Sequence, residues 1–121
     1  NLGYRYSHIS DDNGKSWISK KEESIIDPGC NGSILKYNFK NKNLLLLTNI
    51  NNQKERKEIV IRYSEDEGMN WSSPKVIYEG EAAYSSMTQL SNGDVGIFYE
   101  ADNYNSNIFK SLSIDWILSS K

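Results

Sequence analysis

The chain has 121 residues, a formal net charge of −2 at pH 7, 37% hydrophobic residues and 12% aromatic residues, with a mean hydropathy of −0.67. The aromatic content argues against a disordered chain, and the absence of any block of like charge gives no indication of a nucleic-acid partner or an anionic membrane surface. No apolar run approaches the roughly 20 residues that a membrane span needs, and the single Cys30 excludes an internal disulfide.

Two-residue alternation of apolar and polar side chains predicts strands over residues 3–9, 33–39, 44–50, 59–63, 84–90 and 94–100, with one more after Trp17. By periodicity alone, residues 44–50 (LLLLTNI) fit a buried strand or a short helix, and their length and Asn-rich flanks favour the strand. Turn-forming pairs such as Asn31-Gly32 and Asn92-Gly93 separate the runs. No stretch keeps a 3.6-residue period over three turns, so we expect an all-β fold.

Two loops share the pattern S-x-D-x-G-x-x-W. SDDNGKSW and SEDEGMNW supply Ser10, Asp12, Gly14 and Trp17 in the first copy and Ser64, Asp66, Gly68 and Trp71 in the second. In such a turn the Asp can accept backbone N–H groups, the Gly can supply a positive φ, and the Ser hydroxyl can brace the loop. We expect the Trp to pack between neighbouring strands. These are roles in folding rather than in catalysis.

The two loops lie 54 residues apart. Repeats of roughly 40–50 residues with several short strands are typical of propeller blades, and about four strands fall between the loops, which predicts one four-stranded blade with the loop before its outermost strand. The chain then holds about two to two and a half antiparallel blades, fewer than the roughly four that a propeller needs to close. Because the sequence also begins at Asn1 without Met, we expect the remainder of the propeller upstream.

The repeated loop resembles the Asp-box of sialidases and several unrelated propellers. Four further segments resemble the C-terminal half of the bacterial sialidase (exo-α-neuraminidase) catalytic domain: PGCNGSIL, RKEIVIRYSEDEGMNW, AAYSSMTQL followed by VGIFYE, and the closing NIFKSLSIDWI. Together these matches run from residue 1 to about residue 117. The resemblance implies that residues 1–121 are the C-terminal part of a six-bladed β-propeller. It also implies retaining hydrolysis of terminal α-linked sialic acids on glycoproteins and glycolipids, in a secreted or cell-surface enzyme without a cofactor.

The resemblance places three site residues on the chain. Tyr84 matches the nucleophile, which needs a nearby carboxylate base because a phenol has an ordinary pKa near about 10; a neutral nucleophile also avoids repulsion by the sialic acid carboxylate. Arg56 matches one member of the arginine triad that binds this carboxylate, a task suited to a planar, permanently charged guanidinium. Glu100 matches the carboxylate that orients another triad arginine.

Five other residues are weaker candidates for the site. Arg62 competes with Arg56, but it precedes the second loop at a spacing that the family does not use for the triad. Arg5 and His8 fit structural strand residues. Cys30 fits a small packed residue rather than a thiol nucleophile because no Cys–His pair is present, and Asn31 stands where the family usually has Gln.

The remaining machinery that the resemblance implies is an acid/base Asp, the Glu that activates the tyrosine and two arginines, and none can be assigned within the chain. We therefore expect the 121 residues alone to be inactive. No metal-ligand spacing or phosphate-binding Gly loop is present. The rival interpretations are a non-catalytic Asp-box propeller that binds glycans or proteins and a purely structural domain.

Overall fold

The computed structural model describes residues 3–120, so residues 1, 2 and 121 of the predicted domain lie outside the described part. Within residues 3–120 the chain forms eight strands and one short helix. These are β1 (Tyr4–Ile9), β2 (Ile18–Ile26), β3 (Ser33–Phe39), β4 (Lys42–Ile50), β5 (Lys57–Ser64), β6 (Lys75–Gln89), β7 (Val95–Ala101), β8 (Ser106–Leu112) and α1 (Ile114–Leu118).

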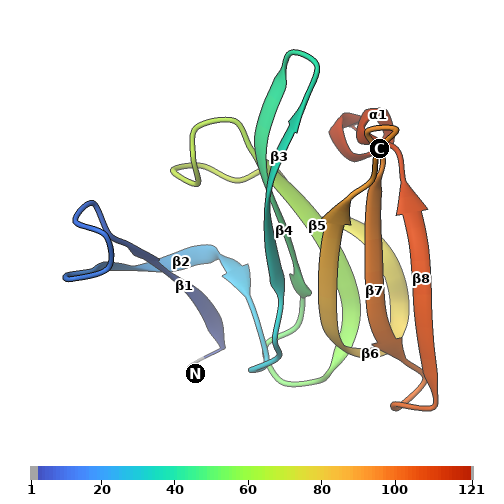
Figure 1. Ribbon diagram of the computed structural model, residues 1–121. Helices are drawn as coiled ribbons and strands as arrows, with labels where there is room; N and C mark the ends of the chain where they lie inside the picture. The colour runs from blue at the N-terminus through green and yellow to red at the C-terminus, as the bar shows by residue number, and fades with distance from the viewer. Residues whose placement is uncertain (1–2, 121) are drawn as a thin grey trace.

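The strands form two antiparallel sheets, one of β1 and β2 and one of six strands in the order β3 to β8 (Figure 1). Strand β2 pairs with β1 and not with β3. The expectation that the four strands between the repeated loops make one blade is therefore wrong: the boundary between sheets falls after β2, since residues 27–32 leave the sheet through the turn at Pro28-Gly29 before β3 begins.

The 15-residue strand β6 joins two blades. Its first half pairs with β5, for example Ile59 with Tyr78, and its second half pairs with β7, for example Ser85 with Tyr99. The second half also lies beside β3, where the Met87 amide donates to Ser33 Oγ at 3.0 Å. Thus β3–β6 form one four-stranded blade, and β6 continues as the first strand of the next, which curls the sheet (Figure 1).

The hydrophobic core lies between these two blades. Its fully buried side chains include Leu46, Ile59, Ile61 and Ile97. Ile59 and Ile61 are two positions apart on β5, so they point to the same face of the sheet. Tyr37 is also buried, and its hydroxyl donates to the Gly93 carbonyl at 2.6 Å. This packing fixes the angle between the blades and thereby the relative positions of their loops.

A buried polar network connects the first sheet to the central blade. Asp27 accepts the amides of Gly29 and Cys30 at 2.7 and 3.0 Å, and its other oxygen lies 3.1 Å from Arg5 Nε. Asn49 donates to Asp27 Oδ2 at 3.1 Å. The Asp27 carboxylate thus has partners on both oxygens, which offsets part of the cost of burying it.

A short helix, α1, follows the last strand. Strand β8 ends at Leu112, and the Ser113 hydroxyl then accepts the Trp116 amide as an N-cap for α1. Ile117 is buried in the core, and Lys75 Nζ lies over the Trp116 ring at 4.5 Å. A serine cap followed by a buried isoleucine explains why the last segment coils instead of extending β8.

The two repeated loops have matching hydrogen bonds. In the second copy Ser64 Oγ donates to Asp66 Oδ1 and accepts the Gly68 amide, both at 2.8 Å. The Asn70 side chain, its amide and the Ser64 hydroxyl lower the pKa of Asp66 to about 2. Gly68 has φ +88°, a conformation that a residue with a Cβ adopts only under strain.

In the first copy the same bonds join the corresponding residues, with Ser10 Oγ accepting the Gly14 amide at 2.8 Å. Ser16 takes the place of Asn70, and its hydroxyl and amide, together with Ser10, lower the pKa of Asp12 to about 2. Trp17 does not pack between strands as expected. It is 59% exposed, because its indole N–H donates to the Gly14 carbonyl and the ring lies on its own turn.

Candidate active site

Tyr84 lies in a β-bulge. Ala82 pairs with Ala101 and Ser85 pairs with Tyr99, so Ala83 and Tyr84 together stand opposite the single residue Glu100. The extra residue twists the strand and changes the direction of its side chains, and the Tyr84 side chain is 42% exposed. Bulges of this kind occur beside active sites because they redirect a functional side chain.

Glu100 occupies the partner position of the bulge. Its Oε2 accepts the Tyr84 amide at 3.2 Å, a group that the bulge removes from the regular ladder between β6 and β7. Within residues 3–120 no carboxylate hydrogen-bonds to the Tyr84 hydroxyl.

Arg56 lies in the loop between β4 and β5 and reaches over the bulge. Its carbonyl accepts the Ala82 amide at 3.0 Å, which ties the loop to β6 two residues before Tyr84. Its guanidinium carbon lies 5.6 Å from the centre of the Tyr84 ring, within the range of a cation–π contact. The structure therefore brings together the three residues that the sequence predicted for the site.

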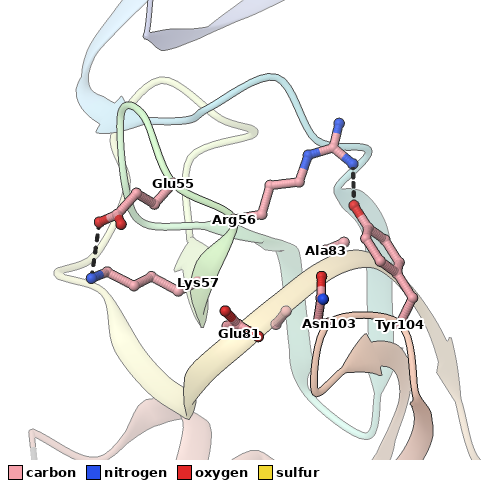
Figure 2. A pocket seen from close by; sticks show the side chains of 8 residues that line it. Glu55, Arg56, Lys57, Glu81, Ala83, Asn103 and Tyr104 are labelled. Atoms are coloured by element: carbon pink, nitrogen blue, oxygen red, sulfur yellow. Dashed lines mark hydrogen bonds and ion pairs between the residues drawn. The ribbon is translucent and has the colours of Figure 1, made fainter.

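Tyr104, in the turn between β7 and β8, is a neighbour of Arg56 that sequence reasoning missed. Arg56 Nη1 donates to the Tyr104 hydroxyl at 2.7 Å (Figure 2). This hydrogen bond is the main cause of a raised pKa of Arg56. The signal in the sequence was a bulky aromatic residue in the polar turn DNYN, but its partner lies 48 positions away along the chain.

A cavity of about 310 Å³ opens beside these residues. Its lining residues are mostly polar or charged: Glu55, Arg56, Lys57, Glu81, Ala82, Ala83, Asn103 and Tyr104 (Figure 2). Tyr84 and Glu100 do not line it, whereas the bulge residue Ala83 does, so the cavity lies directly beside the bulge. The cavity extends the candidate site outward from the proposed nucleophile.

Arg62 and Arg5 have structural partners in the polar network. Arg62 is 2% exposed, and it donates to Asn49 Oδ1 and Asn51 Oδ1, each at 3.1 Å. Burial lowers its pKa. Arg5 donates through Nη2 to the Cys30 carbonyl at 2.7 Å in addition to its ion pair with Asp27. Neither guanidinium is placed as Arg56 is, over the bulge.

The other residues that the sequence set aside also lie in structural positions. His8 Nδ1 is 2.8 Å from Ser19 Oγ on the neighbouring strand. Cys30 is buried, and burial raises the pKa of its thiol, which disfavours the reactive thiolate. The Asn31 carbonyl accepts the Ser85 amide at 3.2 Å, next to the bulge.

Among residues 3–120 there is no group of three or more His, Cys, Asp and Glu side chains that could hold a metal ion. Over the same range, no helix has the length and apolar character to cross a membrane.

An Asp-box blade, a second blade begun by the same long strand, and an exposed tyrosine on a bulge beside an arginine define part of a β-propeller with a candidate active site. The chain matches the BNR repeat-like domain over residues 1–97, and it belongs to this family.

Two curated sialidases are similar in sequence. A sialidase of Micromonospora viridifaciens is 32% identical over 105 residues, which cover 81% of this chain and 16% of that protein. A sialidase of Bacteroides fragilis (strain YCH46) is 29% identical over 108 residues, which cover 82% of this chain and 20% of that protein. The chain thus spans at most 20% of the length of these relatives.

Two solved structures are similar in fold. A Hadza microbial sialidase superposes with a TM-score of 0.76 and 27% identity, covering 92% of this chain and 23% of that one. The intramolecular trans-sialidase from Ruminococcus gnavus, solved with oseltamivir carboxylate, gives a TM-score of 0.81 at 21% identity, covering 99% and 30%. The predicted all-β propeller fragment and its resemblance to bacterial sialidases are confirmed.

Proposed function

We propose that the protein containing this chain is a retaining exo-α-sialidase and that Tyr84 is its nucleophile. The observation that carries the proposal is the bulge in β6, at which Tyr84 is exposed and its amide donates to Glu100. The Arg56 guanidinium lies over the Tyr84 ring. The similarity to two curated sialidases and to a solved sialidase supports the substrate class.

The reaction has two steps. In the first, the Tyr84 oxygen bonds to the anomeric carbon of sialic acid as its proton passes to a base, and the bond to the aglycone oxygen breaks while a general acid protonates that oxygen. In the second, water attacks the anomeric carbon and the tyrosyl bond breaks, so two inversions give net retention. The transition states have oxocarbenium character.

Arg56 supplies the charge for recognition. A sialic acid carries a carboxylate on its anomeric carbon, and a guanidinium binds such a group through two parallel hydrogen bonds. Within the described residues no carboxylate forms an ion pair with Arg56, so its charge is available to a ligand. Its position over the Tyr84 ring would hold the anomeric carbon close to the phenol oxygen.

Glu100 acts through other groups. One carboxylate oxygen holds the Tyr84 amide, and the second is available to orient an arginine of the triad from a neighbouring blade. The general acid, the base for Tyr84 and the other two arginines are not assigned within the chain. We therefore expect these 121 residues by themselves to release no sialic acid, and we propose that the complete protein acts on sialylated glycoproteins and glycolipids outside the cell.

The test is the Tyr84→Phe variant of the complete protein, assayed by release of a fluorophore from a sialoside. Loss of the nucleophile should lower kcat by about 10³-fold or more, while sialic acid binding persists. Tyr6→Phe is the matched control, since Tyr6 is 43% exposed on β1. Unchanged turnover in Tyr84→Phe would exclude the proposed nucleophile; binding without turnover in the wild type would favour a glycan-binding propeller.

A further inference from the structure

The turn between β7 and β8 has an unusual backbone. Asp102, Asn103 and Tyr104 all have positive φ, of 52°, 53° and 67°. Asp and Asn tolerate this left-handed region, but a bulky aromatic residue is a true outlier there. Such a conformation persists only where surrounding contacts impose it, and these positions cluster at functional sites.

The contacts that anchor the turn hold its first residue. The Asp102 amide donates to the Glu81 carbonyl at 2.9 Å, and the Tyr78 hydroxyl donates to Asp102 Oδ1 at 2.7 Å. The Asn105 side chain and amide both donate to the Asp102 carbonyl, at 2.9 and 3.1 Å. The bond from the Asn105 amide to the Asp102 carbonyl closes a four-residue turn in which Asn103 and Tyr104 are the central residues, and positive φ at both is what a type I′ hairpin turn requires.

The turn places Tyr104 at the surface, where it is 55% exposed. Its polar contact is the 2.7 Å hydrogen bond that its hydroxyl accepts from Arg56 Nη1 (Figure 2). Within residues 3–120 no other side chain hydrogen-bonds to Arg56. An exposed tyrosine is thus directed at the guanidinium that the proposed function assigns to the substrate carboxylate.

The bond leaves one edge of the guanidinium open. With Nη1 held by Tyr104, Nε and Nη2 remain together on the other edge, where they can bind both oxygens of a carboxylate in parallel. Arginine otherwise loses much rotamer freedom when it binds, and holding it in advance lowers that cost.

We propose that Tyr104 is a positioning residue whose hydroxyl holds Arg56 Nη1 so that the Nε–Nη2 edge faces the carboxylate of the bound sugar. The inference rests on the proposed function. It assigns the turn between β7 and β8 to substrate recognition.

The test is Tyr104→Phe in the complete protein, which keeps the ring and removes the hydroxyl. We expect KM for a fluorogenic sialoside, and Kd for sialic acid by calorimetry, to rise about five- to tenfold, because the lost bond involves a charged donor in an exposed place. The value of kcat should stay within about twofold, because uniform binding is what is lost. Tyr6→Phe should change neither quantity.

A double-mutant cycle tests whether Tyr104 acts through Arg56. In an Arg56→Ala background, Tyr104→Phe should have no further effect on KM or Kd. Tyr104→Asn gives a second check, because Asn tolerates the left-handed region: we expect undiminished thermal stability with the same loss of affinity. That variant also separates weakened recognition from a damaged turn.

The outcomes are distinguishable. An active wild type with an unchanged or lowered KM in Tyr104→Phe, or with the same rise in the Arg56→Ala background, would overturn the positioning role and leave the proposed function intact. A wild type that neither turns over a sialoside nor binds sialic acid would overturn both.

Discussion

Substitution of Arg62 should lower the free energy of unfolding much more than the same substitution of Arg56. Arg62→Met keeps most of the aliphatic stem but leaves the amide oxygens of Asn49 and Asn51 without their donor. A hydrogen bond from a charged donor contributes about 1.5–3 kcal/mol, and Arg62→Met removes two of them. Part of their combined contribution is offset in the wild type, because burying the guanidinium is costly. We expect a net loss of about 3 kcal/mol in the free energy of unfolding.

Urea denaturation measures this loss. With a slope of about 2 kcal/mol per molar urea, the midpoint of Arg62→Met should fall by about 1.5 M. Arg56→Met is the matched control, and its midpoint should move by less than about 0.3 M because exposed substitutions usually stay within about 0.5 kcal/mol. Equal midpoints for Arg62→Met and the wild type would refute the claim that this network joins the first sheet to the central blade.

Two further predictions concern carboxylates. The pKa of Asp66 is about 2 in the folded state against an ordinary 3.8. Its contribution to stability is therefore present above about pH 4 and is lost as the pH falls toward about 2. The difference in unfolding free energy between wild type and Asp66→Asn should close over that range in acid unfolding curves, and a constant difference would contradict this. For Glu100, a glutamine keeps an acceptor for the Tyr84 amide whereas an alanine does not. Because an acceptor is enough to hold the bulge, Glu100→Gln should retain at least about tenfold more kcat/KM than Glu100→Ala. Equal losses in the two variants would show that the negative charge of Glu100 matters instead.

Local features of the fold could be predicted from the sequence where the interacting groups are neighbours in the chain. The bonds of Ser64, Asp66 and Gly68 lie within one turn, so residue types and spacing determine them. The alternation of Val95 to Ala101 likewise defines a strand. Such elements depend on short-range chemistry that any window of the sequence contains.

The features that the sequence could not provide depend on distant partners. Residues 75–83 were not predicted as strand because Glu79, Gly80 and Glu81 interrupt the apolar pattern, and pairing with β5 outweighs that local preference. The membership of β2 in the first sheet depends on β1 in the same way. The hydrogen bond between Arg56 and Tyr104 joins two loops of adjacent blades, which come together only after the core has packed.

The bulge illustrates both cases. The resemblance of AAYSSMTQL and VGIFYE to sialidases placed Tyr84 and Glu100 at the site, but alternation alone predicts a regular strand from residue 84. Only the register against β7 shows that Ala83 and Tyr84 share one partner. The identity of the site residues was thus accessible from the sequence, and the geometry that exposes the tyrosine was not.

The most direct test of the proposed mechanism is to trap the covalent intermediate on the complete protein. A fluorinated sialosyl fluoride slows breakdown of a glycosyl-enzyme, since the electron-withdrawing fluorine disfavours the oxocarbenium-like transition state. Peptide mass spectrometry should then find the sugar on Tyr84, with no adduct in Tyr84→Phe. An adduct on a different residue, or turnover of the reagent without any adduct on Tyr84, would contradict the assignment of Tyr84 as the nucleophile.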